Sequence, residues 1–128
     1  MKLLLDTHVF LWSIEEYTKL SNKASEAFLN ADNELYLSAA SYWEICLKQS
    51  LGKLGLAENW KKTLDREIAI NAIKWLAIEK QHCQELAELP WLHRDPFDRL
   101  LIAQAQCEGM ALLTADKHIR KYGISTIW

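Results

Sequence analysis

Short apolar runs alternate with longer segments of helical character along the whole chain, and this alternation is the strongest constraint on the fold. The runs lie at residues 3–5, 34–38, 73–78, 110–113 and 125–127. The first of them, Leu3-Leu4-Leu5, is apolar without interruption, which is typical of a strand buried on both faces of a parallel sheet. Strands that alternate with helices are joined by right-handed crossovers and form a parallel sheet. The sequence therefore predicts a three-layer α/β/α fold with a central parallel sheet of about five strands.

Capping residues, Gly and Pro set the expected limits of the helices. The predicted helices cover residues 8–16, 21–30, 38–50, 57–70, 81–88, 95–109 and 116–121. Ser21 and Ser38 are expected to cap their helices, and Asp95 is expected to cap a helix that begins at Pro96. We expect Gly109 to end that helix.

The overall composition predicts one ordinary globular domain over residues 1–128. Half of the 128 residues are apolar and a quarter are charged, which suffices for a full hydrophobic core. The net charge of -2 excludes a polycation that grips nucleic acid by its overall charge. Contact with nucleic acid would therefore need a local basic patch, or a metal ion that offsets acidic side chains.

Cysteine spacing and apolar run lengths indicate a cytoplasmic protein without a membrane partner. Cys46, Cys83 and Cys107 are unevenly spaced and form neither a disulfide framework nor a CxxC metal motif. We expect them to be buried free thiols in a reducing compartment. The apolar run after Lys2 is too short for a signal peptide, and no run has the length of a transmembrane helix.

Two aspartates stand at the ends of predicted strands. Asp6 follows Leu5 directly, and Asp116 closes the segment ALLTAD. Both are expected at the edge of the sheet where parallel α/β folds bind ligands. An ionised carboxylate in a dry interior costs several kcal/mol unless it is paired or bound to a metal. Each aspartate also has a second interpretation, as the cap of the next helix, and both interpretations stay open here.

Two further acids lie on predicted helices. In the helix after Ser38, Glu44 is expected at the edge of the buried stripe, although a solvated glutamate is the alternative. That stripe is expected to contain Ala39, Ala40, Trp43, Cys46, Leu47 and Leu51. Asp98 shares a helix face with Leu101, Ile102 and Ala105. Complementing the helix dipole would explain the charge of Asp98 but not its place on the inward face.

Four acids that converge on one edge would repel one another unless a cation lay between them. All-oxygen sets of this kind suit Mg²⁺ or Mn²⁺, which retain water ligands and bind phosphate substrates. Such a metal activates water and stabilises charge on a phosphodiester. The four acids therefore favour metal-dependent phosphodiester chemistry.

Four segments spread over nearly the whole chain carry a resemblance to a known family. They are LLLDTHVFLW, SAASYWEICLK, HRDPFDRLLIAQAQ and ALLTADKHIRKYG followed by STIW. In order and spacing they resemble PIN-domain ribonucleases, and more closely the VapC-like toxins of prokaryotic toxin–antitoxin pairs. The resemblance implies a toxin that uses Mg²⁺ or Mn²⁺ to cut single-stranded regions of RNA. Carried over by position, the implied metal and catalytic residues are Asp6, Glu44, Asp98 and Asp116.

The resemblance also suggests roles for neighbours of these acids. Thr7 and Thr114 would orient carboxylates or water. Some relatives have a further acid where this chain has Lys117-His118, so we expect one firmly held ion and a second that arrives with RNA. The expected RNA contacts are His93, Arg94, Lys117 and Arg120, with His118 and Lys121 in the same basic cluster. Each has an alternative as a loop or surface residue, and His8 is expected on the surface rather than at the metal.

Two protein partners follow from the resemblance and from helix faces. An antitoxin segment is expected in an apolar groove near Trp12, with Val9, Phe10 and Leu11 beside it. Ile45 is expected nearly opposite the buried stripe of its helix and thus free to join a homodimer.

Two other function classes compete with the ribonuclease. An aspartyl-nucleophile phosphatase would need Asp-x-Asp, and His8 stands where the second Asp belongs. A catalytically inactive interaction module with the same fold would lack one of the acids, and all four are present. The sequence therefore favours the ribonuclease.

Overall fold

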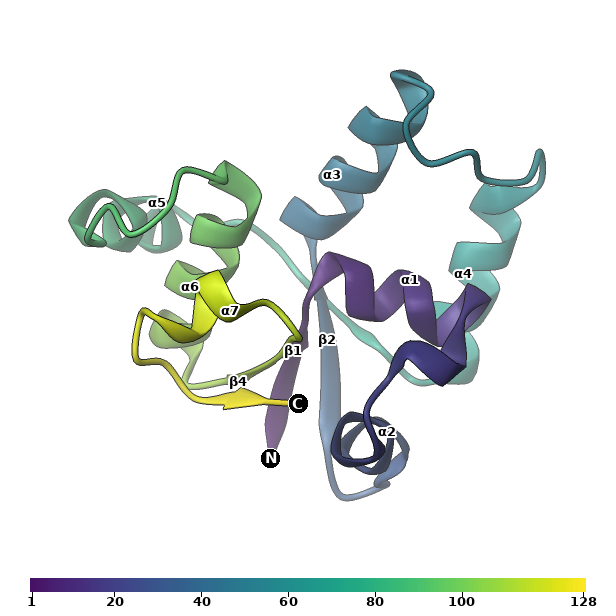
Figure 1. The fold of residues 1–128 in the computed structure, drawn as a ribbon, viewed down its shortest axis with the longest axis horizontal. Helices are drawn as coiled ribbons and strands as arrows, with labels where there is room; N and C mark the ends of the chain where they lie inside the picture. Colours follow the sequence, from purple (N-terminus) through teal and green to yellow (C-terminus); the bar gives the residue numbers. More distant parts are fainter.

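The computed structural model describes all 128 residues and contains one parallel sheet of five strands in the order β3-β2-β1-β4-β5 (Figure 1). The strands are β1 (Lys2–Leu5), β2 (Glu34–Ser38), β3 (Lys74–Leu76), β4 (Ala111–Leu113) and β5 (Thr126–Ile127). All four pairings between neighbours are parallel. The predicted three-layer α/β/α fold is confirmed.

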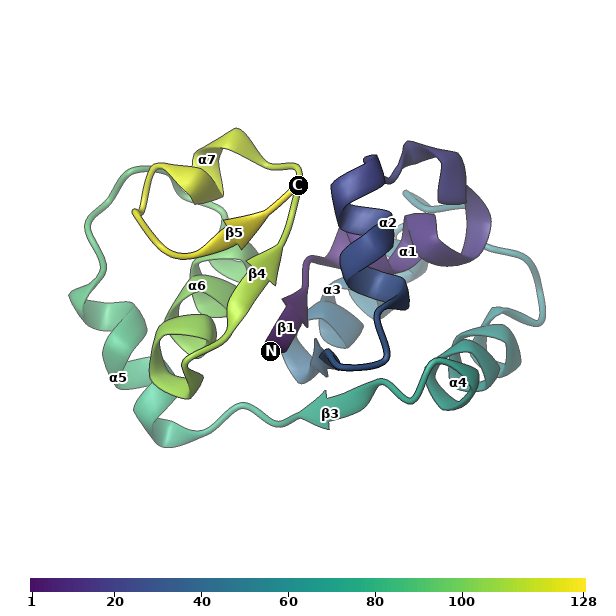
Figure 2. The ribbon, with the colours of Figure 1, turned by 90° about the horizontal axis from the view of Figure 1, so that it is seen from below.

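Helices cover both faces of this sheet. They are α1 (Thr7–Glu15), α2 (Asn22–Leu29), α3 (Ala39–Ser50), α4 (Trp60–Ile70), α5 (Lys80–Glu88), α6 (Pro96–Glu108) and α7 (Lys117–Arg120), with a 3₁₀ turn, η1, at Tyr17–Lys19. Figure 2 shows α5 and α6 on one side of β1, and α1, α2 and α4 on the other. No helix has the length and apolar character needed to cross a membrane.

The all-leucine strand β1 is buried on both faces, as its unbroken apolar sequence predicts. Leu3 and Leu5 belong to the core beneath α1 and α2, whereas Leu4 belongs to the core beneath α6. All three are fully buried. Because successive side chains of a strand point to opposite faces, one strand anchors both cores. The position of Asp6, directly after this strand, is therefore fixed.

The predicted caps lie where the sequence places them. The hydroxyls of Ser21 and Ser38 accept hydrogen bonds from the N–H groups of the first turns of α2 and α3, at 3.0 Å each. Asp95 accepts from the N–H groups of Phe97 and Asp98 at 2.9 and 3.0 Å. Gly109 ends α6 in the left-handed conformation that glycine adopts without strain, with φ 64°. These caps fix where α3 and α6 begin, and both helices begin at the site.

Helix α4 is shorter than predicted. It begins at Trp60 rather than at residue 57, because the carbonyl of Ala57 accepts from the Trp60 N–H in a preceding turn. The third strand is also shorter, and covers only Lys74–Leu76.

The buried face of α3 differs from the predicted one. Its fully or almost fully buried residues are Ala40, Ser41, Glu44 and Ile45. Trp43 and Leu51, expected inside, are 57% and 60% exposed, and Leu47 is also exposed. The prediction that Ile45 is free for a partner is wrong, because Ile45 belongs to the main core. Ser41 turns inward because it accepts a hydrogen bond from Thr7 of α1, and Glu44 and Ile45 lie on the same face of α3.

The three cysteines are free thiols, as predicted, but they are not all buried. Cys46 is half-buried, whereas Cys83 and Cys107 are exposed. The latter two lie on α5 and α6, whose outward faces carry them.

Candidate active site

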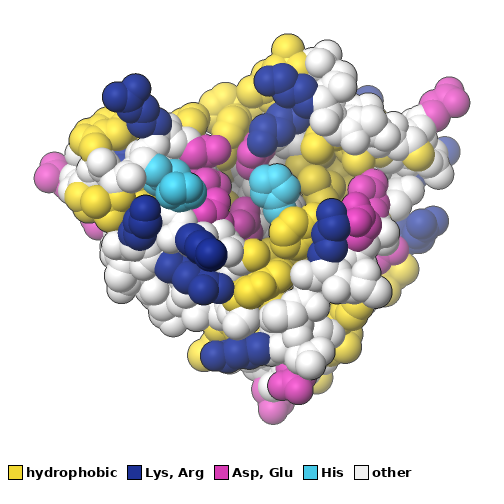
Figure 3. Space-filling model, viewed as in Figure 1, with side chains coloured by type: hydrophobic (Ala, Val, Ile, Leu, Met, Phe, Trp, Pro, Cys, Tyr) yellow, Lys and Arg dark blue, Asp and Glu magenta, His cyan; other side chains and the backbone are white.

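The candidate site lies beyond the carboxyl ends of β1 and β4, the neighbouring strands from which the sheet extends in opposite directions. Sheets wound in this way bind ligands in the crevice at that point. The N–H of Asp6 donates to the carbonyl of Leu113 at 3.0 Å, which holds the two strand ends together. Acidic side chains gather near the centre of this face, with His, Lys and Arg side chains around them (Figure 3).

Asp6 is not a helix cap. It occupies the position before α1, but its side chain makes no hydrogen bond to the N–H groups of that helix. Instead the hydroxyl of Thr114 donates to its Oδ2 at 2.6 Å. Burial raises the pKa of Asp6, although the Thr114 bond and nearby His8 lower it in part. The capping interpretation of Asp6 is therefore wrong, and a buried carboxylate remains.

Asp116 combines the two roles that the sequence left open. Its Oδ1 caps α7 by accepting from the N–H of His118 at 2.8 Å. Its own N–H donates to the hydroxyl of Thr114 at 3.0 Å, so that one threonine contacts both acids. Asp6 and Asp116 also line the same hollow of about 280 Å³, together with His8 and Trp12. Capping one helix therefore leaves Asp116 at the site.

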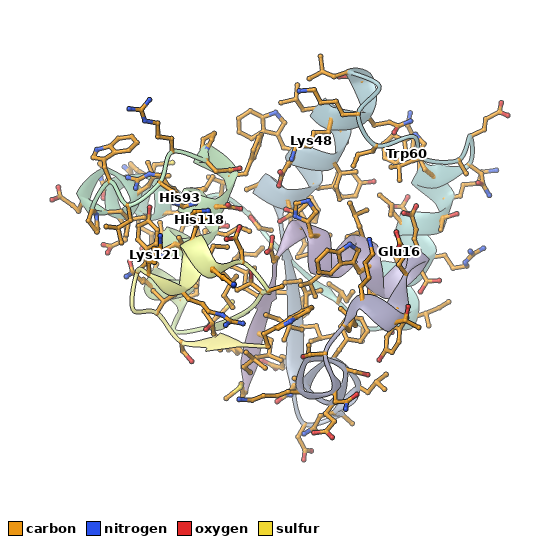
Figure 4. The ribbon with its side chains drawn as sticks, viewed as in Figure 1. Glu16, Lys48, Trp60, His93, His118 and Lys121 are labelled. Atoms are coloured by element: carbon orange, nitrogen blue, oxygen red, sulfur yellow. The ribbon has the colours of Figure 1, made fainter.

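Glu44 is almost fully buried and is paired with a lysine that the sequence analysis did not single out. Lys48 Nζ lies 2.6 Å from Glu44 Oε2, one helical turn further along α3. The hydrogen bond to Glu44 raises the pKa of Lys48, and the negative charges of Asp95 and Asp98 act in the same direction. Lys48 points from α3 toward the middle of the face (Figure 4). The spacing of four residues was a usable signal for this pair.

Replacing Lys48 should expose the repulsion among these acids. We expect Lys48→Met to lower the unfolding free energy of the metal-free protein by about 1–2 kcal/mol, since Glu44 would stay buried without its cation. Added Mg²⁺ should recover most of this loss. Thermal unfolding in EDTA measures the loss of stability, and thermal unfolding in Mg²⁺ measures its recovery. Lys61→Met, at an exposed lysine, is the control. Equal midpoints for Lys48→Met and Lys61→Met in EDTA would show that Lys48 does not offset the acids.

Asp98 is an acid whose surroundings strongly disfavour its charged form. Burial, followed by the charges of Asp6, Asp95 and Asp116, raises the pKa of Asp98 to about 8. The carboxyl is only 15% exposed and lies in the first turn of α6. Its inward placement matches the helix-face prediction. Without a cation, this group is therefore mostly protonated near neutral pH.

A histidine and a tyrosine support Asp98. His93 Nε2 lies 3.3 Å from Asp98 Oδ2, and His93 Nδ1 lies 2.7 Å from the hydroxyl of Tyr122. The ring of His118 stacks on that of His93, with centroids 5.7 Å apart and planes 6° apart. Both histidines face the site from the α6 and α7 side (Figure 4). Burial lowers the pKa of His93.

Two predictions about residues of α1 differ from the structure. The hydroxyl of Thr7 donates to Ser41 at 2.9 Å and so holds α1 against α3 instead of orienting a carboxylate. Val9 and Phe10 are fully buried in the core and form no groove beside Trp12, whereas Leu11 lines a hollow between α1 and α4.

The predicted basic residues surround the acids without pairing with them. Arg94, Lys117, Arg120, Lys121 and His118 are all exposed. None of the five forms an ion pair with a carboxylate. Their charges are therefore available to a phosphate.

The acids suit a divalent metal by their chemistry. Asp6, Glu44, Asp98 and Asp116 supply only carboxylate oxygens, and the charges of Asp6, Glu44 and Asp116 all raise the pKa of Asp98. In this arrangement no three His, Cys, Asp or Glu side chains stand close enough together to enclose an ion. The donor set fits Mg²⁺ or Mn²⁺, which complete their coordination with water.

Fold, site and sequence comparison agree on a family. Residues 3–124 match the family model of the PIN domain, so the chain belongs to the PIN domain family. It is 30% identical to Ribonuclease VapC22 of Mycobacterium tuberculosis (strain ATCC 25618 / H37Rv), over 93% of this chain and 90% of that protein.

Solved structures of low sequence identity share the fold. A chain of VapBC2 from Rickettsia felis, bound to a DNA fragment from its promoter, superposes with a TM-score of 0.76 at 16% identity. The match covers 98% of this chain and 97% of that chain. A chain of DNA-bound VapBC from Salmonella typhimurium gives a TM-score of 0.70 at 17% identity, over 98% and 96% of the two chains.

Proposed function

We propose that this protein is a metal-dependent endoribonuclease, the toxin of a toxin–antitoxin pair, which hydrolyses phosphodiester bonds in single-stranded or loop RNA. The observation that carries the proposal is the set of four buried or half-buried acids at the centre of the sheet edge, Asp6, Glu44, Asp98 and Asp116. A PIN-family chain with a ribonuclease relative supports the same activity. The free cysteines are in keeping with action in the cytoplasm.

The four acids would hold Mg²⁺ or Mn²⁺, and the other residues would prepare them. Thr114 keeps Oδ2 of Asp6 oriented through its 2.6 Å hydrogen bond. Asp98 would release its proton as the metal binds, because a cation beside it offsets both causes of its raised pKa, burial first and the neighbouring like charges second. The bound metal would activate water and stabilise charge on the phosphodiester. Exposed Lys117 and Arg120 lie next to Asp116 along α7 and would bind flanking phosphates.

We also propose an antitoxin and a second copy of the chain as partners. Solved structures that share the fold of this chain are of VapBC complexes, which supports an antitoxin. Its apolar residues would enter a hollow between α1 and α4, lined by Leu11, Ile14 and Trp60 among others. For the homodimer, the exposed residues Trp43, Leu47 and Leu51 form an apolar line on α3 in place of buried Ile45. Light scattering with and without antitoxin tests both partners.

The purified chain should cleave single-stranded RNA in Mg²⁺ or Mn²⁺ and lose this activity in EDTA, because the acids alone carry no catalytic cation. Adding back either metal should restore cleavage. Gel analysis of end-labelled RNA measures this, and Asp98→Asn prepared in parallel excludes a contaminating nuclease. Absence of cleavage by wild type in either metal, over many single-stranded and hairpin RNAs, would favour the inactive interaction module.

A further inference from the structure

A chain of hydrogen bonds runs from a buried arginine to one of the candidate metal ligands. It passes from Arg99 through Tyr122 and His93 to Asp98. The donors and acceptors along it are restricted enough to fix where the protons lie.

The chain begins at Arg99, which can only donate. Its side chain is 2% exposed and has no carboxylate partner. Nη1 donates to the carbonyl of Pro90 at 2.7 Å, and Nη2 donates to that of Leu89 at 3.3 Å, just beyond the end of α5. The guanidinium also lies 4.0 Å from the ring centre of Trp91. Carbonyls at a helix C-terminus carry partial negative charge, so they hold this cation in place.

Tyr122 receives two of these fixed N–H groups. Arg99 Nη1 donates to its hydroxyl oxygen at 3.0 Å, and the backbone N–H of His93 donates to it at 3.3 Å. Neither nitrogen can accept a hydrogen bond. Both lone pairs of the oxygen are therefore used, and the hydroxyl proton must go to the remaining neighbour, His93 Nδ1, at 2.7 Å.

The state of the His93 ring follows. Nδ1 accepts the tyrosine proton, so it carries none of its own, and a neutral imidazole must then carry its proton on Nε2. Nε2 is the atom that faces Asp98 Oδ2, at 3.3 Å. The opposite tautomer would require the Tyr122 oxygen to accept three hydrogen bonds, from Arg99 and from the backbone and the ring of His93.

We infer that Arg99 and Tyr122 lock His93 in the Nε2–H tautomer, which makes His93 a positioning residue for Asp98. This inference rests on the proposed function, because it gives Asp98 the role of a metal ligand. The neutral N–H of His93 occupies Oδ2, and no side chain or backbone group of the protein donates to Oδ1. Because His93 is neutral, it orients the carboxylate of Asp98 without adding a positive charge that would compete with the metal ion. Oδ1 of Asp98 is left for that ion.

The tautomer itself is directly measurable. In protein labelled with ¹⁵N at its histidine rings, the two ring nitrogens of His93 should give the separate signals of a single Nε2–H tautomer at about pH 7.5. In Tyr122→Phe they should move toward the averaged signals of an imidazole that exchanges between its two tautomers. The signals that are absent from the spectrum of His93→Gln identify those of His93. A wild-type His93 that is protonated on Nδ1, or whose signals are averaged between the two tautomers, would overturn the inference.

Metal binding tests the positioning role. Tyr122→Phe and His93→Ala should weaken Mn²⁺ binding about 10–100-fold, as is typical when the support of a metal ligand is lost. His93→Gln, which can still present an N–H to Asp98, should retain most of the affinity. Tyr17→Phe is the matched control, since it loses a 2.7 Å hydrogen bond to Ser25 far from the site.

Calorimetric titration with Mn²⁺ separates the two possible failures. If wild type binds Mn²⁺ and both Tyr122→Phe and His93→Ala bind it equally well, the positioning role is wrong and the proposed function stands. If wild type binds no Mn²⁺, the proposed function fails, whereas the tautomer still stands or falls on the ring signals. Thermal unfolding of each variant confirms that it is folded before titration.

Discussion

Asp6→Asn is expected to fold at least as well as wild type and to lose RNA cleavage by more than about 100-fold, beyond the loss typical of a supporting residue. The change keeps the shape of the side chain and leaves an oxygen that can accept the 2.6 Å hydrogen bond of Thr114. It removes a charge from a group of acids whose mutual repulsion and burial raise the pKa of Asp6. A hard cation loses an anionic ligand, whereas the metal-free fold loses only repulsion.

Two matched variants separate metal binding from other effects of this change. Glu16→Gln also removes one negative charge, but from an exposed residue beyond the end of α1, and should leave cleavage unchanged. Asp6→Ala should be less stable than Asp6→Asn, because the buried hydroxyl of Thr114 loses its acceptor. Cleavage rates are compared in saturating Mg²⁺ and Mn²⁺, and thermal midpoints in EDTA. Cleavage by Asp6→Asn near the wild-type rate would show that Asp6 holds no metal.

The sheet, the helix caps and the inward-facing acids could be predicted, because each is indicated by residues that lie close together in the sequence. An unbroken run such as Leu3–Leu5 indicates a doubly buried strand whatever surrounds it. Ser38 and Asp95 cap their helices through hydrogen bonds that span at most three residues. With a parallel sheet predicted, the acids that follow strands must meet at one edge.

The orientation of α3 could not be predicted, because the most apolar face of this helix is not the face that is buried. Trp43 is more apolar than Ser41 or Glu44, yet it lies outside and they lie inside. The hydrogen bond that holds this face inward is that of Ser41 with Thr7 of α1, whereas Glu44 is paired with Lys48 within the same helix. The first joins residues 34 apart in the chain, and no periodicity reports such a contact.

The residues that hold Asp98 in place could not be predicted from the sequence either. His93 was predicted as an RNA contact, but its two ring nitrogens already face Tyr122 and Asp98. Arg99 stands between an acid and a leucine in the sequence, where nothing marks it as buried. Its partners are carbonyls of residues 86, 89 and 90 and a hydroxyl of residue 122, and a sequence does not reveal such acceptors.

The metal-free protein should lose stability relative to Asp98→Asn as the pH rises from about 4 to about 8. The folded state raises the pKa of Asp98 from 3.8 to about 8, so within this window the folded protein holds a proton that the unfolded chain has released. The unfolding free energy therefore falls with rising pH. Below this window Asp98 is protonated in both states, and above it in neither, so the slope vanishes at both ends.

Comparison with Asp98→Asn cancels the contribution of titrating residues far from the site, so the difference between the two proteins reports Asp98 and the acids that interact with it. Near pH 4, at the lower end of the window, the two midpoints in EDTA should be close, because folded Asp98 is still protonated and the unfolded chain has only begun to release its proton. Near pH 9 the variant should be more stable by on the order of 20 °C, since a pKa raised by about four units corresponds to about 6 kcal/mol and 1 kcal/mol moves the midpoint by about 4 °C in a domain of this size. Mg²⁺ should reverse that order, because it binds ionised Asp98 in the folded state only and has no such ligand in the variant. The contrary result is a wild-type midpoint that stays above that of Asp98→Asn at pH 9 in EDTA. It would mean that Asp98 is not held among repelling acids. The assignment of Asp98 as a metal ligand would then lose its electrostatic basis.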